Sequence, residues 1–112
     1  MVPLEDLAEE HGLDVEDVIE LLQDFVEYTE SENLPAMRQG LITSDHTAVS
    51  NAAHSIKGAA LNLRLLDIGT LARQIEEQSR TGDLAGIDEL MNSLVELVKG
   101  LAGELSDRML DR

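Results

Sequence analysis

Apolar residues recur at helical spacing along almost the whole chain, and this spacing is the feature that most restricts its fold. A period of about 3.6 residues places such side chains on one face of an α-helix, whereas a half-buried strand needs alternation with a period of two. No stretch of the sequence shows that alternation. Short clusters of Gly, Asp and Ser interrupt the pattern, and such clusters are typical of turns. The chain is therefore predicted to be all-α.

The first two helices are marked by their end signals. A short helix is expected from Pro3 to His11, with Pro at its first position and Gly12 just past its end. Asp14 is expected to cap the second helix. Proline lacks a backbone N–H and collides with the preceding turn, so Pro35 predicts a kink or short break near position 33 before the pattern continues.

Three further helices follow. Ser44 or Asp45 is expected to cap the first of them, the next starts at about Asp67 and is closed by Gly82, and Asp83 is expected to cap the last. Connections between these three helices are only a few residues long, so neighbouring helices must run antiparallel. The predicted inward positions of the last helix, close to a heptad repeat, are Ile87, Leu90, Met91, Leu94, Val98, Leu101, Leu105 and Met109.

The length of 112 residues allows one hydrophobic core and is too short for two. We therefore predict one domain over residues 1–112, an antiparallel up-down four-helix bundle with a short N-terminal extra helix. Because the aromatic residues are only Phe25 and Tyr28, the core must be built from Leu, Ile, Val, Ala and Met.

The composition excludes several classes of partner. Eight Lys and Arg stand against 23 Asp and Glu, and the net charge of −15 would repel nucleic acid and anionic lipid. No apolar run approaches the roughly 18 residues of a membrane span, and the N-terminus lacks the features of a signal peptide. The absence of cysteine excludes disulfides and fits a reducing compartment. We expect no nucleic-acid or membrane partner and a cytoplasmic location.

Residues 53–63 hold the most informative cluster of side chains. If each residue turns the helix by about 100° and the mean direction of the apolar positions is zero, His54 points at roughly 140° and Gly58 at about 180°. Lys57 lies at about 80° and Leu61 at about 120° on the same scale. All four therefore share one outward stripe. The apolar positions are Val49, Ala52, Ala53, Ile56, Ala60 and Leu63.

Each residue of this stripe suits phosphoryl transfer. The neutral imidazole of His54 is a nucleophile near neutral pH, and its phosphoramidate stays reactive enough to pass the group on. The ammonium of Lys57 can attract a phosphoryl oxygen. Glycine in a helix interior costs roughly 0.5 to 1 kcal/mol relative to Ala, so Gly58 is interpreted as clearing space for a partner protein. Leu61 would supply apolar contact area for that partner.

The run His-Ser-Ile-Lys-Gly-Ala-Ala-Leu-Asn-Leu, which starts at His54, resembles the signature of the histidine-containing phosphotransfer (HPt) family. In that family a phospho-accepting His precedes an apolar residue, Lys, Gly and two small residues. The resemblance covers nearly the whole chain, because the family fold is a four-helix bundle with this His on the second bundle helix. It implies that His54 is phosphorylated on Nε2 and that Lys57 and Gly58 take the accessory positions.

One position departs from the family pattern. The family commonly has Gly ten residues after the His, where this chain has Arg64, which either ends the helix less cleanly or adds a second cation near the docking surface. On the following helix the family often has polar residues that orient the His or the phosphoryl group. Arg73, Gln74 and Glu76 lie in that region, and the sequence does not choose among them. We take Leu61, Arg64, Arg73 and Gln74 as candidate binding residues.

Other kinds of site find little support. Helical bundles bind metals through Glu-x-x-His pairs, but no His here has an acid three residues before it. We expect no metal and no cofactor in this chain, and we expect His11 and His46 to be surface or capping residues. A kinase would need a nucleotide-binding region, for which no residues remain after the bundle is built. The chain is therefore expected to be a phosphocarrier without autonomous kinase activity.

The resemblance implies that the partners are receiver domains, either of response regulators alone or also of a hybrid histidine kinase. The receiver would contribute the Mg²⁺ and most of the catalytic groups. An alternative interpretation is a helical adaptor or dimerisation bundle in which His54 is incidental. Such an adaptor would be indifferent to His54→Gln, whereas a phosphocarrier would lose all transfer with its fold intact.

Overall fold

The computed structural model describes residues 2–110, which form helices joined by short turns and contain no strand. The predicted all-α class is therefore confirmed. In chain order the elements are α1 (Leu4–His11), α2 (Val15–Tyr28), the π-helical turn η1 (Thr29–Asn33), α3 (Leu34–Ile42), α4 (His46–Asn62), α5 (Leu66–Arg80) and α6 (Ile87–Leu110).

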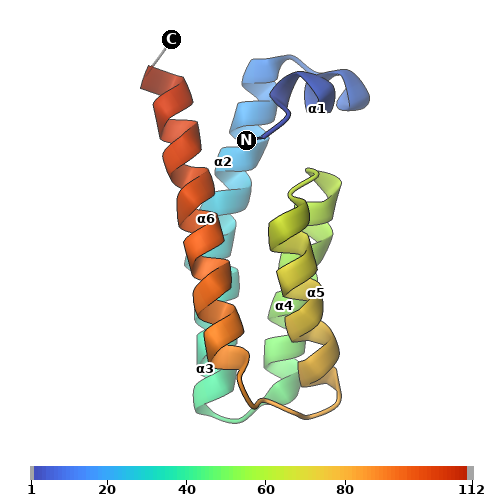
Figure 1. Cartoon of the computed structure of the whole chain (residues 1–112), viewed down its shortest axis with the longest axis vertical. Coiled ribbons are helices and arrows are strands. Elements are labelled where there is room, and N and C mark those ends of the chain that lie inside the picture. The colour runs from blue at the N-terminus through green and yellow to red at the C-terminus, as the bar shows by residue number, and fades with distance from the viewer. Residues whose placement is uncertain (1, 111–112) are drawn as a thin grey trace.

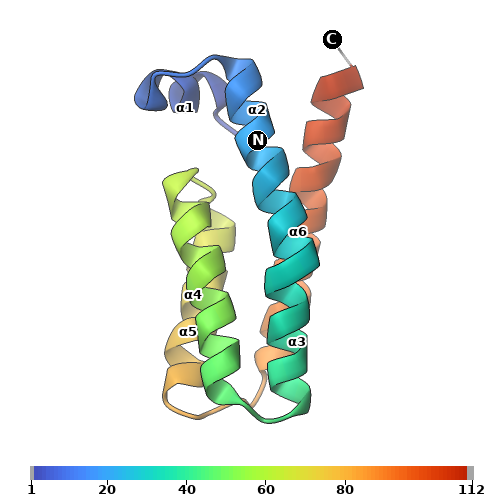
Figure 2. The same cartoon turned by 180° about the vertical axis from the view of Figure 1, so that it is seen from behind.

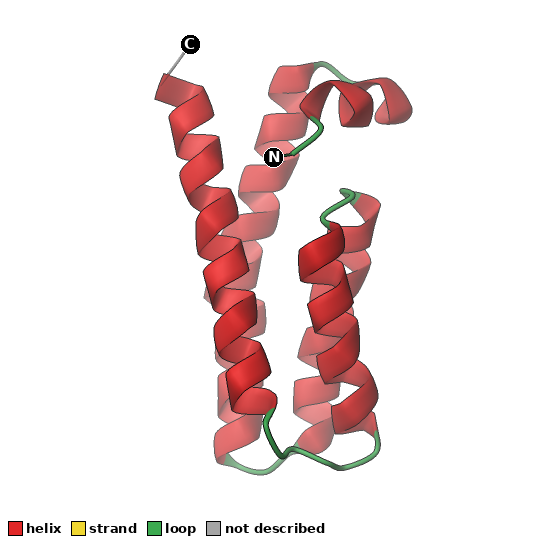
Figure 3. Cartoon of the chain, viewed as in Figure 1, coloured by secondary structure: helices red, strands yellow, loops and turns green. Residues whose placement is uncertain are grey.

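Four long helical segments run antiparallel to their neighbours and form the bundle (Figure 1). The first is α2 continued through η1 into α3, and the others are α4, α5 and α6. Short loops join α3 to α4 and α5 to α6 at one end of the molecule (Figure 3). At the other end α1 lies across the tops of α4 and α5, as the view from behind also shows (Figure 2). The predicted four-helix bundle with an extra N-terminal helix is confirmed.

The predicted disturbance near Asn33 takes the form of a π-helical turn. The chain passes from α2 to α3 without a non-helical gap, and η1 covers residues Thr29–Asn33. Pro35 is the second residue of α3 and follows η1 directly, so its missing N–H falls where the hydrogen-bond pattern changes from π-helical to α-helical. The widened turn of a π-helix thus absorbs the irregularity that the sequence places here.

The helix starts agree only partly with the predicted caps. Asp45, rather than Ser44, caps α4, because its Oδ1 accepts a hydrogen bond from the backbone N–H of Ala48 at 3.1 Å. The prediction for Asp83 is wrong, since α6 begins four residues later at Ile87. The Asp83 carboxylate instead accepts from a backbone N–H two residues on, at 3.0 Å, and so stabilises the preceding loop.

One core lies between the helices, and it is almost entirely aliphatic. All six predicted inward positions of α4 are buried. The predicted seam of α6 is buried or half-buried except for Met109, whose side chain is 51% exposed. Met109 lies near the end of α6 that extends beyond α4 and α5, so those neighbours cannot cover it (Figure 1). Within residues 2–110 we find no helix whose length and apolar character would let it cross a membrane.

Candidate phosphotransfer site

His54 lies on the outer surface of α4, as the helical spacing predicts. Its side chain is 65% exposed, while Ala53 beside it and Ile56 two residues on are fully buried. The buried neighbours fix the rotation of α4 about its axis. They thereby hold the imidazole on the solvent side of α4.

A buried carboxylate on the neighbouring helix contacts this imidazole. Oε2 of Glu76 on α5 lies 2.6 Å from Nδ1 of His54. The same carboxylate accepts from the ammonium of Lys57 through Oε1 at 2.6 Å and from the guanidinium of Arg80 through Oε2 at 2.8 Å. The Glu76 side chain is only 2% exposed. One carboxylate therefore joins α4 to α5 and organises three donor side chains.

The contact with Glu76 fixes the tautomer of His54. Burial tends to raise the pKa of Glu76, but the hydrogen bonds from Lys57 and His54, and their charges, hold this pKa below its ordinary value of 4.5. Glu76 is thus a carboxylate at neutral pH and can only accept. Nδ1 must carry the shared hydrogen, which leaves the lone pair of the neutral ring on Nε2, directed away from Glu76.

A cavity of about 370 Å³ opens beside the imidazole, between the first turns of α4 and the last turn of α5. It has polar walls, which suits an anion more than an apolar ligand. Its lining residues are His46, Thr47, Ser50, Asn51, His54, Glu76 and Arg80. His46 is therefore a surface residue, as expected, but one that borders the site.

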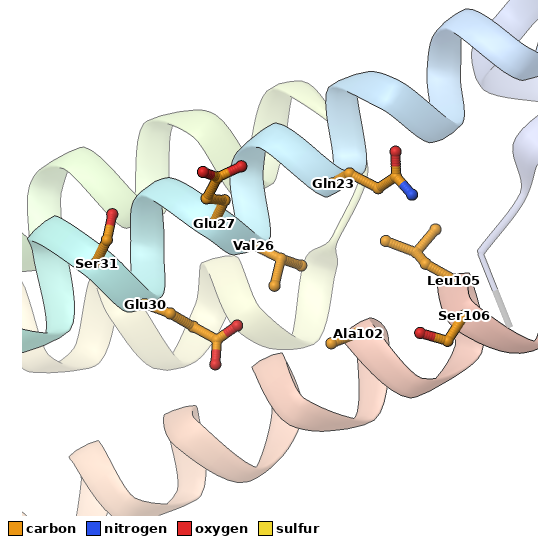
Figure 4. Close-up of a pocket in the computed structure, with 8 residues that line it drawn as sticks. All are labelled: Gln23, Val26, Glu27, Glu30, Ser31, Ala102, Leu105 and Ser106. Atoms are coloured by element: carbon orange, nitrogen blue, oxygen red, sulfur yellow. The ribbon is translucent and has the colours of Figure 1, made fainter.

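A larger cavity of about 560 Å³ lies elsewhere, between α2, η1 and α6 (Figure 4). No His, Lys or Arg lines it, and two of its lining residues are the acids Glu27 and Glu30. Among the described residues it therefore offers no imidazole and no cation for phosphoryl chemistry. The side chains, and not the volume of a cavity, identify the candidate site at His54.

Gly58 and Leu61 lie on the same outward stripe as His54. Gly58 is exposed, and a Cβ added to it would have no neighbour within 4 Å. Leu61 is 43% exposed, and its side chain rests on α5 at Gly69, where an added Cβ would come within 2.5 Å of it. A Cβ at Gly69 would therefore force the Leu61 side chain to move, whereas a Cβ at Gly58 would displace nothing within the described chain.

Arg64 does not join the cluster around His54. It adopts a left-handed conformation with φ of 58°, just past the end of α4, and its guanidinium pairs with Glu10 of α1 at 2.9 Å. Glycine adopts this conformation at the lowest cost. The sequence left two interpretations of Arg64 open, and the structure supports neither. Helix α4 ends cleanly at this residue, and the guanidinium lies beside Glu10 and not beside His54.

On α5, the residue that contacts His54 is Glu76, and not Arg73 or Gln74. Both are exposed, and neither hydrogen-bonds to His54 within residues 2–110. Arg73 lies one turn before Glu76 on the same side of α5, whereas Gln74 points away from it.

Glu76 follows Ala72 by four residues and so falls on the buried face. A carboxylate at a buried helical position was the signal that could have selected it. The sequence analysis did not select Arg80, which lies one turn beyond Glu76 and donates a hydrogen bond to it.

No group of three His, Asp or Glu side chains within residues 2–110 is arranged to hold a metal ion.

Comparison with known proteins places this arrangement in a family. Residues 20–107 match the sequence profile of the Hpt domain. No curated protein sequence matches the chain. Among solved structures, the chain resembles histidine-containing phosphotransfer protein B (HptB) from Pseudomonas aeruginosa PAO1 with a TM-score of 0.84. The two share 23% sequence identity over 97% of this chain and 91% of that one, so this likeness concerns the fold. The profile match, which spans most of the chain, shows that this protein belongs to the Hpt domain family of phosphorelay histidine phosphotransfer proteins.

Proposed function

We propose that His54 accepts a phosphoryl group on Nε2 from the aspartyl phosphate of one receiver domain and passes it to a second receiver. The observation that carries this proposal is the hydrogen bond of 2.6 Å between His54 Nδ1 and the buried carboxylate of Glu76. That bond leaves the Nε2 lone pair facing solvent, where a partner protein can reach it.

In the proposed step, the Nε2 lone pair forms a bond to phosphorus while the bond from phosphorus to the aspartyl oxygen breaks. The electron pair of the broken bond returns to the receiver's carboxylate. Nδ1 keeps its hydrogen, so the ring becomes positively charged as the N–P bond forms. Glu76 stabilises that charge through the hydrogen bond already in place, as the buried carboxylate of a catalytic triad does for its imidazole. Transfer to the second receiver is the reverse reaction.

The neighbouring residues support this step in different ways. Lys57 is 23% exposed and lies one turn from His54, so its ammonium can attract a phosphoryl oxygen while it remains near Glu76. Gly58 leaves open space beside the imidazole, and Leu61 offers an apolar contact for the docking receiver. The receiver supplies the Mg²⁺ and most catalytic groups, and this chain acts as a phosphocarrier without kinase activity.

The central test is phosphorylation of the purified protein by phosphorylated receiver domains from the same organism. His54→Gln should abolish acid-labile, alkali-stable labelling while it leaves helical content and the melting temperature nearly unchanged, because an exposed side chain contributes little packing. His46→Gln is the matched control, since this residue lines the same cavity but has no contact with Glu76. Labelling of the His54→Gln protein at the wild-type level would refute the proposal and favour the adaptor interpretation.

A further inference from the structure

Arg80 is a cation beside His54 to which the transfer step above assigns no role. It lies on the last turn of α5 and donates to Glu76 Oε2 at 2.8 Å, and this same oxygen lies 2.6 Å from His54 Nδ1. Both contacts are made to the same oxygen atom. The donating nitrogen of Arg80 can therefore lie no farther from His54 Nδ1 than the sum of these two distances. The arginine is therefore next to the imidazole, although it comes from another helix.

The guanidinium of Arg80 can move, whereas the carboxylate that binds it is fixed. The Arg80 side chain is 66% exposed, and the Glu76 side chain is 2% exposed. When Arg80 leaves, His54 and Lys57 still donate to Glu76, so the buried carboxylate keeps two of its three donors. Arg80 can thus leave Glu76 without disturbing the core.

There is room for an anion between Arg80 and His54. The cavity of about 370 Å³ beside the imidazole is bordered by both side chains, and Glu76 is the only acid that lines it. Its other walls are polar residues from the first turns of α4. A guanidinium that swung from Glu76 toward Nε2 would remain at the edge of this cavity.

The charge balance at the site calls for a second cation. A phosphoryl group adds roughly two negative charges. Glu76 contributes a third negative charge, while Lys57 and the positively charged ring of phosphorylated His54 offset two, so one negative charge remains in a chain that already carries −15. Half of the eight Lys and Arg residues lie between positions 46 and 80, on α4, α5 and their connection, and Lys57 and Arg80 are the two that contact Glu76.

We propose that Arg80 exchanges Glu76 for the phosphoryl oxygens when His54 is phosphorylated, so that it acts as a second cation for the bound phosphoryl group. One hydrogen bond, from Arg80 to Glu76, breaks, and a hydrogen bond from Arg80 to a phosphoryl oxygen forms. The Nδ1–H of His54 stays on Glu76 throughout. The proposal rests on phosphorylation of His54.

The first test measures the rate at which phosphoramidate, a small-molecule donor, phosphorylates His54 at low ionic strength, with the His54→Gln protein as the blank. The N–P bond of phosphoramidate breaks, ammonia leaves, and a new N–P bond forms at Nε2. Arg80→Gln should lower this rate about threefold to tenfold, because one charge-assisted contact is lost. Arg80→Lys should recover most of it. Lys99→Gln removes one positive charge from exposed α6 and should react at the wild-type rate.

The second test separates direct contact with the phosphoryl group from an effect through Glu76. The side-chain Nε–H signal of Arg80 in a ¹H–¹⁵N NMR spectrum, assigned by its loss in Arg80→Gln, should shift when wild-type protein is phosphorylated by phosphoramidate. A residue that only neutralises Glu76 would keep its partner and its signal position.

Three other results would each overturn a claim made above about Arg80 or His54. A slower Arg80→Gln protein with no shift of the Arg80 signal would make Arg80 a positioning residue for Glu76 and overturn direct contact. If the Arg80→Gln and Lys99→Gln proteins both reacted at the wild-type rate, Arg80 would have no role in the phosphorylation of His54. Wild-type protein with no label above the His54→Gln blank would refute the phosphotransfer role itself, and the Arg80 proposal with it.

Discussion

At the scale of single residues, the carboxylate of Glu76 determines what His54 can do. A buried charge is costly unless it is paired and hydrogen-bonded, and Glu76 receives hydrogen bonds from His54, Lys57 and Arg80. These donors hold its pKa below the ordinary value despite burial. The same interactions that keep Glu76 charged also fix the His54 tautomer. Stability and reactivity are therefore coupled at this one residue.

This coupling predicts a pH dependence for the Glu76→Gln variant. Because the pKa of Glu76 is lower in the folded than in the unfolded chain, its charge stabilises the fold above pH 4.5, and this contribution is lost as the pH falls through the folded pKa. Denaturant unfolding should show a wild-type advantage at neutral pH that shrinks as the pH falls below about 4.5. Transfer at pH 7 should slow at least about tenfold in the variant, since an amide cannot stabilise the charged ring as a carboxylate does. A stability difference that does not change with pH would contradict this account.

The sequence predicted His54 and Lys57 but not Glu76, and the reason is geometric. His54 and Lys57 share one helix, where a separation of three residues by itself places side chains on one face. Glu76 reaches them across the contact between α4 and α5, which depends on how two helices pack. The sequence could limit the partner to the polar residues of α5. The spacing of four residues from Ala72 could have favoured Glu76 over Arg73, but the contact with His54 itself depends on how α4 and α5 pack.

At the scale of helices, α3 and α4 end in the same way. The residue after each last turn, Ser44 or Arg64, is left-handed, with φ of 55° and 58°. The next backbone N–H reaches back to a carbonyl of the last turn at 2.8 Å in both cases, from Asp45 to Gly40 and from Leu65 to Ala60. This is the Schellman arrangement, in which glycine usually occupies the left-handed position.

Arg64 therefore offers a test of backbone strain at the end of α4. Arg64→Gly and Arg64→Ala both remove the ion pair with Glu10, so they differ only in how readily they adopt positive φ. A left-handed conformation costs a non-glycine residue roughly 1–2 kcal/mol. The Gly variant should be more stable than the Ala variant by about 1 kcal/mol in a denaturant melt. Equal stabilities would mean that φ relaxes when the arginine is removed.

Gly58 allows a second test, in which stability and function should change in opposite directions. A Cβ at this position meets nothing, so Gly58→Ala should stabilise the bundle by about 0.5–1 kcal/mol. Gly58→Leu should keep the helix but project into the space that a receiver occupies, and transfer from a phosphorylated receiver should fall steeply. Gly100→Leu, at another open position on α6, should leave transfer unchanged. Normal transfer by Gly58→Leu would disprove the docking role.

Helix ends were easier to predict than helix starts, for a physical reason. A glycine such as Gly12 or Gly82 is left-handed here with φ of 67° and 86°, and few other residues accept that conformation. An acidic residue can stabilise either a helix start or a loop with the same carboxylate. Asp45 and Asp83 look alike in the sequence, yet one caps α4 and the other holds the loop before α6.

At the scale of the whole molecule, most acidic residues lie in a different part of the sequence from the helix that carries His54. Twelve of the 23 acids precede the first basic residue, Arg38, and α4 between His46 and Asn62 contains no acid. The helix that carries His54 thus contains no acid, although the chain as a whole is strongly acidic. If His54 accepts a phosphoryl group as proposed, this distribution reduces the repulsion that the incoming anion meets on α4.

The N-terminal helix α1 closes the end of the bundle where α4 and α5 stop (Figure 1). The Hpt match begins at residue 20, beyond α1, yet Leu7 of α1 is fully buried. If α1 is part of the cooperative core, Leu7→Ala should lower the free energy of unfolding by about 2–5 kcal/mol. Glu10→Gln, at an exposed position of α1, should change it by less than about 1 kcal/mol. Transfer by the Leu7→Ala protein at a temperature where it is folded should be normal, because α1 does not contact His54. If Leu7→Ala instead left the global stability unchanged and only sped hydrogen exchange within α1, that helix would be a separate, locally unfolding element.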